Sequence, residues 1–262
     1  MEGLTRVTPD IYRLVVPFLD IYTSVFVVRT EEGDLLYDTA TYPEDIDKYI
    51  VPALNELGVT RESLKVVIVS HNHRDHAGGL SRFAELYPNT VIAAGSSACT
   101  ERVSGRNVRV LSDGESVLGP LSALMIPGHE SDCIGIIDKR TATLLSGDGL
   151  QLYGIYGSGA WGSNIDIISE HIAVCEKIKS LGLNTVIASH DYHPCGYRAD
   201  GFVAIARYAD QCIAALYTVR DYILANPEIT DNTELAQRYN AHSGLPTVGR
   251  HVFAAVREVL CK

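Results

Sequence analysis

One segment, Lys65–Leu80, constrains the chain more than any other and reads KVVIVSHNHRDHAGGL. The β-branched run Val66–Val69 predicts a buried strand. Potential metal ligands follow it in what we expect to be a short loop: His71, His73, Asp75 and His76. Gly78 and Gly79 then let the backbone turn closely before an apolar-periodic helix that begins near Leu80. The segment therefore predicts a strand, a ligand-bearing loop and a helix.

The spacing of these ligands predicts how they are used. His71 and His73 lie two residues apart, so in extended backbone they point the same way and can share one ion. Asp75 and His76 diverge from that pair, which fits a second ion better than a single four-ligand site. Neutral imidazole and carboxylate oxygen favour Zn²⁺, or Mn or Fe if more oxygen ligands join. The alternative is a polar loop whose histidines only cap the strand and the helix, and the pattern favours metal over it.

The hexapeptide HNHRDH resembles the H-x-H-x-D-H motif of the metallo-β-lactamase superfamily of dinuclear metallo-hydrolases. Three further parts of the family pattern follow in order: His129 in MIPGHESD, Asp148 in TLLSGDG and His190 in TVIASHDYH. The match extends to about residue 195. The resemblance implies that two divalent metal ions are bound by His71, His73, Asp75, His76, His129, Asp148 and His190. It assigns His71, His73 and His129 to one ion, and Asp75, His76 and His190 to the other, with Asp148 bridging.

The order of the predicted elements indicates an α/β fold. A strand ending in Asp, a helix, and a strand ending in Ser-His occur twice, first from Asp38 to His71 and again from Asp148 to His190. The second helix is expected over 163–182, with Ser163 and Asp166 as a capping box. We expect a pseudo-twofold arrangement, although a chance recurrence is the alternative. The resemblance implies the same class, a four-layer αββα sandwich of the metallo-β-lactamase type with a helical C-terminal extension.

The composition becomes helical after Asp200. An apolar stripe runs from Phe202 to Ile223 at i, i+3/i+4 spacing and stops at Asn226-Pro227. Two shorter helices are expected near 233–239 and 247–260. We therefore expect a metallo-β-lactamase-like domain over residues 1–196. Residues 197–262 would form the extension, packed on the core or at a homodimer interface.

Several residues outside the ligand set are candidates for other roles. Residues 149–162 are rich in glycine and aromatic residues, so they form either a flexible connection or a substrate-binding lip. On the second interpretation Tyr153, Tyr156 and Trp161 contact the substrate. His193 is either a substrate contact or proton donor, or a solvent-exposed loop histidine. Asp38 either accepts an N–H from a ligating histidine in the second coordination shell, or caps a helix as an acidic turn residue.

Composition limits the classes of partner. The chain has 262 residues and a formal net charge of −10, which disfavours a nucleic-acid groove. No apolar run has the length of a membrane span, and the first residues do not resemble a signal peptide. The six cysteines form no C-x-x-C pair, which is typical of free thiols in a reducing compartment. We therefore expect a cytoplasmic protein that acts on a small-molecule substrate.

The expected activity is metal-dependent hydrolysis of a small ester, thioester or lactone by a metal-bridged hydroxide, with Asp75 and Asp148 as the catalytic carboxylates. The commonest metallo-β-lactamases have Cys where Asp148 stands, and quorum-quenching lactonases have Tyr where Gln151 stands. Glyoxalase II-like thioesterases share the ligands, but their basic glutathione-binding tail is not evident. Two alternatives stay open: a phosphodiesterase or ribonuclease, and a non-catalytic metal-binding interaction module.

Overall fold

The computed structural model describes residues 3–103 and 105–262, and their contacts divide the chain into two compact units. Unit 1 consists of the chain up to Met125 together with Ile134–Gly147. Unit 2 consists of Ile126–Cys133 and Asp148–Lys262. The domain boundary expected near residue 196 stays a prediction.

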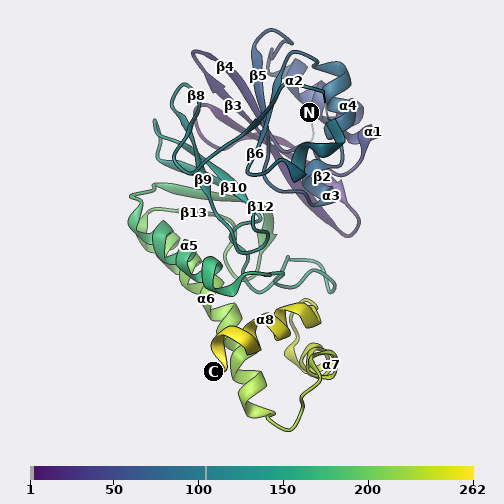
Figure 1. Cartoon of the computed structure of the whole chain (residues 1–262). Helices are drawn as coiled ribbons and strands as arrows, with labels where there is room; N and C mark the ends of the chain where they lie inside the picture. Colours follow the sequence, from purple (N-terminus) through teal and green to yellow (C-terminus); the bar gives the residue numbers. More distant parts are fainter. Residues whose placement is uncertain (1–2, 104) are drawn as a thin grey trace. The chain divides into compact units, whose positions relative to one another are not determined.

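Unit 1 contains a seven-stranded sheet whose strands lie side by side in sequence order (Figure 1). Its strands are β1 (Leu4–Arg6), β2 (Ile11–Phe18), β3 (Ile21–Thr30), β4 (Gly33–Tyr37), β5 (Leu64–Val69), β6 (Val91–Ala94) and β7 (Val108–Val110). Strands β1 to β4 are antiparallel, whereas β4 to β7 are parallel. Parallel neighbours end at the same edge of a sheet, so the residues after β4 and β5, Asp38 and Ser70, lie close together.

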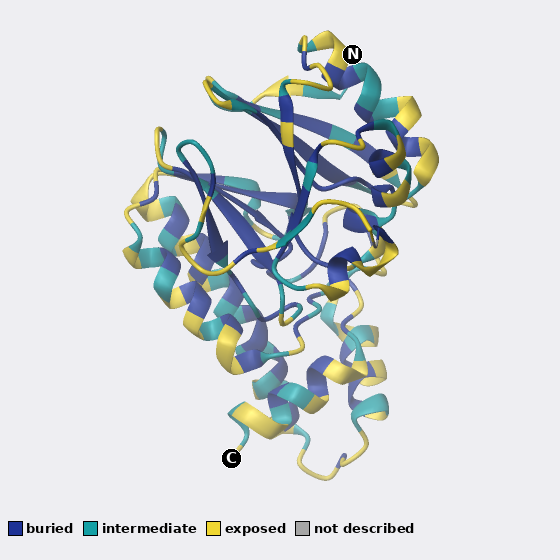
Figure 2. Ribbon diagram, turned by 45° about the horizontal axis from the view of Figure 1, so that its top comes forward, coloured by how far each residue is buried: buried dark blue, intermediate teal, exposed yellow. Residues whose placement is uncertain are grey.

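The crossovers between the parallel strands are helical, as the sequence predicts. Between β4 and β5 lie α1 (Pro43–Asp45), the π-helical turn η1 (Ile46–Ile50) and α2 (Val51–Glu56). The next crossover contains α3 (Arg74–Ala77) and α4 (Leu80–Leu86), and the 3₁₀ turn η2 (Ala98–Val103) precedes β7. The helices bury one face against the sheet, where Ile50, Val67 and Phe83 belong to one apolar core (Figure 2).

The loop expected after β5 is partly helical. His73 is the N-cap of α3, and Asp75 and His76 lie within this single turn. The backbone at Gly78 and Gly79 passes close to the backbone of Thr39 and Thr41, which is the close approach expected from the two glycines. A Cβ atom on Gly78 would lie 1.9 Å from the Thr41 carbonyl oxygen, and one on Gly79 would lie 2.2 Å from that of Thr39.

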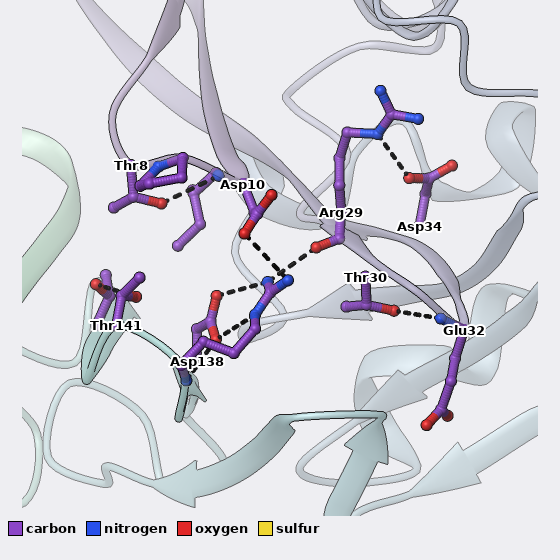
Figure 3. Close-up of polar contacts among 12 residues, drawn as sticks. Thr8, Asp10, Arg29, Thr30, Glu32, Asp34, Asp138 and Thr141 are labelled. Carbon is purple, nitrogen blue, oxygen red and sulfur yellow. Dashed lines mark hydrogen bonds and ion pairs between the residues drawn. The ribbon is translucent and has the colours of Figure 1, made fainter.

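Unit 1 also holds strands of a second sheet: β8 (Ser116–Leu118), β9 (Leu121–Met125), β10 (Ile134–Asp138) and β11 (Thr143–Gly147). Neighbouring strands in this group are antiparallel. Arg140, in the turn after β10, ties them to the first sheet. Its guanidinium group binds Asp138 at 2.7 Å and Asp10 at 3.1 Å, and donates to the Arg29 carbonyl oxygen at 2.8 Å (Figure 3).

Unit 2 combines the hairpin of β12 (Thr185–Tyr192) and β13 (Gly196–Asp200) with four helices. These are α5 (Ile168–Ser180), α6 (Phe202–Ala225), α7 (Asn232–Ser243) and α8 (Arg250–Leu260). Helix α5 packs along α6, and α8 contacts α5, α6 and α7. The core between them includes Ile168, Leu216 and Phe253. The expected C-terminal helices are therefore confirmed, although Phe202 at the start of the stripe is exposed.

The expected helix start at Ser163 is wrong. Helix α5 begins at Ile168 and has no side-chain cap, so Ser163 and Asp166 form no capping box. The backbone N–H groups of Asp166 and Ile167 donate to the Gly128 carbonyl oxygen, both at 2.9 Å. Because the loop uses these donors, the chain enters the helix later than the periodicity suggests.

The chain thus has the mixed α/β fold expected, with two sheets and flanking helices. Apart from short β-bridges, residues 149–162 form no regular structure. All six cysteines are free thiols. Among the described residues, no helix combines the length and apolarity that crossing a bilayer requires.

Gly78 gives a test of the close approach after α3. Its φ of −66° suits any residue, so the need for glycine is steric. We expect Gly78→Ala to lower the free energy of unfolding by about 3 kcal/mol, because the new methyl group overlaps the Thr41 carbonyl. The matched control is Gly159→Ala, where a Cβ would meet nothing within 4 Å. Urea unfolding measures both, and equal stability of the two variants would contradict the steric argument.

Candidate metal centre

Asp38 is the centre of the polar cluster in unit 1. It follows β4 with a φ of 70°, a left-handed conformation that aspartate tolerates better than most residues. Its Oδ1 accepts the Ser70 backbone N–H at 2.8 Å. Its Oδ2 accepts the Ser70 hydroxyl at 2.9 Å and lies 2.8 Å from His76 Nδ1. From the sequence, Asp38 has two alternative roles, a helix cap or the partner of a ligating histidine. Its contact with His76 favours the second role.

These contacts fix the tautomers of two imidazoles. His76 Nδ1–H donates to the Asp38 carboxylate, which leaves the lone pair on Nε2. The Ser70 hydroxyl has one proton and gives it to Asp38, so at 3.0 Å its oxygen accepts from His71 Nδ1–H. The same carboxylate therefore sets the lone pair of both His71 and His76 on Nε2, the atom through which each would bind a metal ion.

The cluster is fully buried, since Asp38, His71 and His76 have 0% exposure. Burial raises the pKa of Asp38, while the interaction with His76 and the hydrogen bonds from Ser70 oppose that rise. A buried carboxylate is costly unless it is paired and hydrogen-bonded. Its three donors therefore support the ionised form that holds the histidines.

The other predicted ligands of unit 1 lie beside this cluster. The ring centroids of His71 and His73 are 4.8 Å apart, and those of His71 and His76 are 4.3 Å apart. Asp75 Oδ2 lies 3.2 Å from His76 Nε2. The structure therefore brings the four ligand-type residues of the H-x-H-x-D-H segment together, and the Asp75 side chain keeps 15% exposure.

Unit 2 holds the remaining predicted ligands. His190 lies within β12, and Asp148 directly follows Gly147 at the end of β11. The two side chains are paired, with 3.4 Å between His190 Nε2 and Asp148 Oδ1. Both are almost completely buried, at 1% and 6% exposure.

His129 is oriented by a residue that sequence reasoning missed. Its Nδ1 lies 2.5 Å from the Asn164 carbonyl oxygen. A carbonyl can only accept, so Nδ1 carries the proton and Nε2 keeps its lone pair. Asn164 is itself held by Gln151, whose Oε1 accepts the Asn164 N–H at 2.7 Å, and by His251, whose Nε2 hydrogen-bonds to Asn164 Oδ1. A backbone acceptor leaves no side-chain signal in a sequence.

The donor chemistry of these residues fits a divalent metal ion. His and Asp groups able to hold an ion are present among the described residues. Nδ1 is hydrogen-bonded in His71, His76 and His129, and this outer-shell pattern is typical of metal-bound imidazoles. The identity and number of the ions stay predictions.

The aromatic candidates lie together in unit 2. The Tyr156 and His193 rings have centroids 3.6 Å apart, and Tyr156 is 40% exposed. The Tyr153 N–H donates to the His193 carbonyl oxygen at 3.3 Å. The Trp161 carbonyl oxygen accepts the Ile155 N–H at 2.8 Å, which closes the loop on itself. The segment is therefore folded, and its contact with a substrate stays a prediction.

Comparison with known proteins decides the family. The model of the metallo-β-lactamase superfamily matches residues 20–190, which contain every predicted metal ligand. The chain belongs to this superfamily. A metallo-β-lactamase family protein of Thermus thermophilus has a similar structure, with a TM-score of 0.69 and 20% identity over 96% of this chain and 92% of that one. The DIM-1 metallo-β-lactamase gives 0.64 and 14% identity over 81% and 97%. These structures confirm the fold.

Sequence relatives differ in function. Hydroxyacylglutathione hydrolase of Prochlorococcus marinus is 28% identical over 60% of this chain and 67% of its own length. Atrochrysone carboxyl ACP thioesterase of Aspergillus fumigatus is 24% identical, over 61% and 35%. The uncharacterized protein YobT of Bacillus subtilis is 25% identical, over 47% and 60%. The matches span about one third to two thirds of these relatives.

Asp38→Asn tests the role of the central carboxylate. The amide keeps the shape but loses the charge that fixes the tautomers of His71 and His76. We expect the affinity for metal to fall about 10–100-fold. Asp34→Asn is the matched control, because Asp34 is also buried on β4 and binds Ser63 and Arg29 instead. Metal retained during titration with a chelator measures both, and equal retention by the two variants would refute the role.

Proposed function

We propose that the chain is a metal-dependent hydrolase of a small ester, thioester or lactone, with a thioester as the favoured substrate. The observation that carries the proposal is the set of buried imidazoles whose Nδ1 atoms are fixed by Asp38, Ser70 and Asn164. A hydrogen bond from Nδ1 to an outer partner is the arrangement that metal-ligating histidines have, and it supports a metal ion bound through Nε2. Membership of a superfamily of metallo-hydrolases supports this reaction class.

The proposed ligands would hold two divalent metal ions, with Zn²⁺ favoured and Mn or Fe as alternatives. His71, His73 and His129 would bind one ion, and Asp75, His76 and His190 the other. Asp148 would bridge the two. Bound ions of this kind lower the pKa of water and polarise a carbonyl group.

The residues of the chain have distinct tasks in this proposal. Asp75 keeps 15% side-chain exposure and His76 none, so the Asp75 carboxylate is the group of this pair that would hold a proton during hydrolysis. Asp148 would contribute negative charge from a nearly buried position, at 6% exposure. Tyr156 and His193 present two tilted rings in contact, a partly exposed surface that suits an acyl or thiol substituent.

A thioester is favoured over a lactone for a structural reason. Quorum-quenching lactonases have a tyrosine at the position of Gln151, but here this side chain is buried and binds the Asn164 N–H. It supports the loop and offers no hydroxyl group to a substrate. Two of the sequence relatives are named as a hydroxyacylglutathione hydrolase and an ACP thioesterase, which supports the same choice.

A hydrolysis screen tests the substrate class. Acyl-thioesters, lactones, β-lactams and bis-aryl phosphates are offered to Zn, Mn and Fe forms of the chain. We expect the highest kcat/KM on a thioester, and no turnover after chelation in any form. A preference for the phosphate diester would overturn the proposal in favour of a phosphodiesterase. No turnover by any metal-loaded form would favour the non-catalytic module.

Asp148→Asn tests the bridging role. The amide cannot supply the same charge, so metal content and activity should fall together. We expect activity to fall more than about 100-fold, because losing a ligand exceeds the loss of a residue that only supports one. Asp210→Asn is the control, since Asp210 pairs with Lys179 on the surface of unit 2. Full activity of Asp148→Asn with unchanged metal content would refute the bridging role.

A further inference from the structure

A second group of ligand-type residues lies inside unit 2, between α5 and α6. His171 and Cys175 are one turn apart on α5, and Cys212 lies on α6, which packs along α5 (Figure 1). One ligand atom from each lies within 4.8 Å of the other two. All three residues have 0% exposure. The group shares no residue with the predicted hydrolytic centre.

The imidazole of His171 is poorly satisfied for a buried polar group. Its Nδ1 has no hydrogen-bond partner among the described residues. Its Nε2 faces the Cys175 sulfur at 3.8 Å, a long contact with a weak partner. Buried polar atoms in folded proteins are almost always paired, so an exception needs an explanation. If this position only filled the core, an aliphatic residue would avoid the cost.

The two thiols also influence each other. The hydrogen bond with Cys212 and the neighbouring His171 lower the pKa of Cys175, whereas burial raises the pKa of Cys212. Cys175 is therefore the more acidic of the two thiols, and a thiol binds metal after it loses its proton. Tyr208 lies one turn before Cys212 on α6, and its buried hydroxyl also has no hydrogen-bond partner among the described residues.

We propose that His171, Cys175 and Cys212 form a separate structural site for one thiophilic d¹⁰ cation, either Zn²⁺ or Cu⁺. Cysteine sulfur is the soft donor that such ions select, and imidazole nitrogen suits both zinc and copper. The i, i+4 spacing on α5 places two ligands on one helix face, and the packed helix supplies the third.

Charge balance suits a dry interior with either ion. Zn²⁺ would displace a proton from each thiol, and the resulting site with two thiolates and a neutral imidazole has no net charge. Cu⁺ would displace a single proton and leave one thiol, which again gives no net charge. A neutral complex avoids the large penalty of burying a charge. The site would join α5 to α6 as a crosslink that forms only in the folded chain.

Cobalt substitution of the full chain tests the proposal. The protein is purified under reducing conditions, stripped with a chelator and loaded with Co²⁺, whose thiolate complexes absorb strongly in the near ultraviolet. The ligands proposed for the hydrolytic centre include no sulfur, so this absorption reports on the cysteine site alone. We expect the band in the wild-type chain, and we expect added Zn²⁺ or Cu⁺ to remove it. Whichever of the two ions removes the cobalt band at the lower concentration is the preferred cation.

Variants assign the band to its residues. Cys175→Ser and Cys212→Ser should each lose it and bind one ion fewer per chain. The controls Cys99→Ser and Cys261→Ser alter free thiols outside the group and should keep it. A band that persists in both Cys175→Ser and Cys212→Ser would overturn the assignment.

X-ray absorption of the wild-type chain loaded with Zn²⁺ or Cu⁺ gives a second readout that does not depend on how the variants fold. We expect sulfur at about 2.3 Å in the Zn²⁺ form. A first shell of nitrogen and oxygen alone, or a wild-type chain without the cobalt band, would overturn the proposal. If the metal-loaded wild-type chain shows the sulfur signal but hydrolyses no substrate, the proposed function is overturned and the cysteine site is not.

Discussion

The carboxylate of Asp38 is the interaction on which the candidate site of unit 1 depends. It lies at the end of β4 in a left-handed conformation and accepts hydrogen bonds from Ser70 and His76. Ser70 in turn accepts from His71. One buried charge therefore sets the proton positions of two imidazoles. The parallel pairing of β4 with β5 is what brings these residues together, so the sheet and the site have a common origin.

The local parts of this arrangement could be predicted from the sequence. The β-branched run Val66–Val69 predicted β5, because composition acts over a few residues. The H-x-H-x-D-H segment could be assigned because its ligands lie within one short stretch. The glycines after it were expected to allow a close approach, and the distances from Gly78 and Gly79 to neighbouring carbonyls confirm this. The single turn of α3 was missed because a four-residue helix has almost no periodicity.

The rest depends on contacts distant in sequence or made through the backbone. The Asn164 carbonyl orients His129, and the Gly128 carbonyl takes the N–H groups that a helix beginning earlier would have used. Any residue has a carbonyl group, so neither contact leaves a signature. His251 and Asn164 are 87 positions apart, and only the packing of α8 brings them together. The sequence could not identify His171 as a candidate ligand, because Cys212 of the proposed site lies on another helix.

Gly128 shows how closely a candidate ligand and the cysteine group are joined within unit 2. A Cβ atom at Gly128 would lie 2.6 Å from the Cβ of His171, and the φ of 146° already favours glycine. The same residue precedes His129 and accepts the hydrogen bonds that fix the entry to α5. A cation held between α5 and α6 would therefore stiffen the support of the His129 loop without touching its imidazole. Because the loop and the helix entry share one glycine, a cation at the proposed cysteine site would be physically coupled to the orientation of His129.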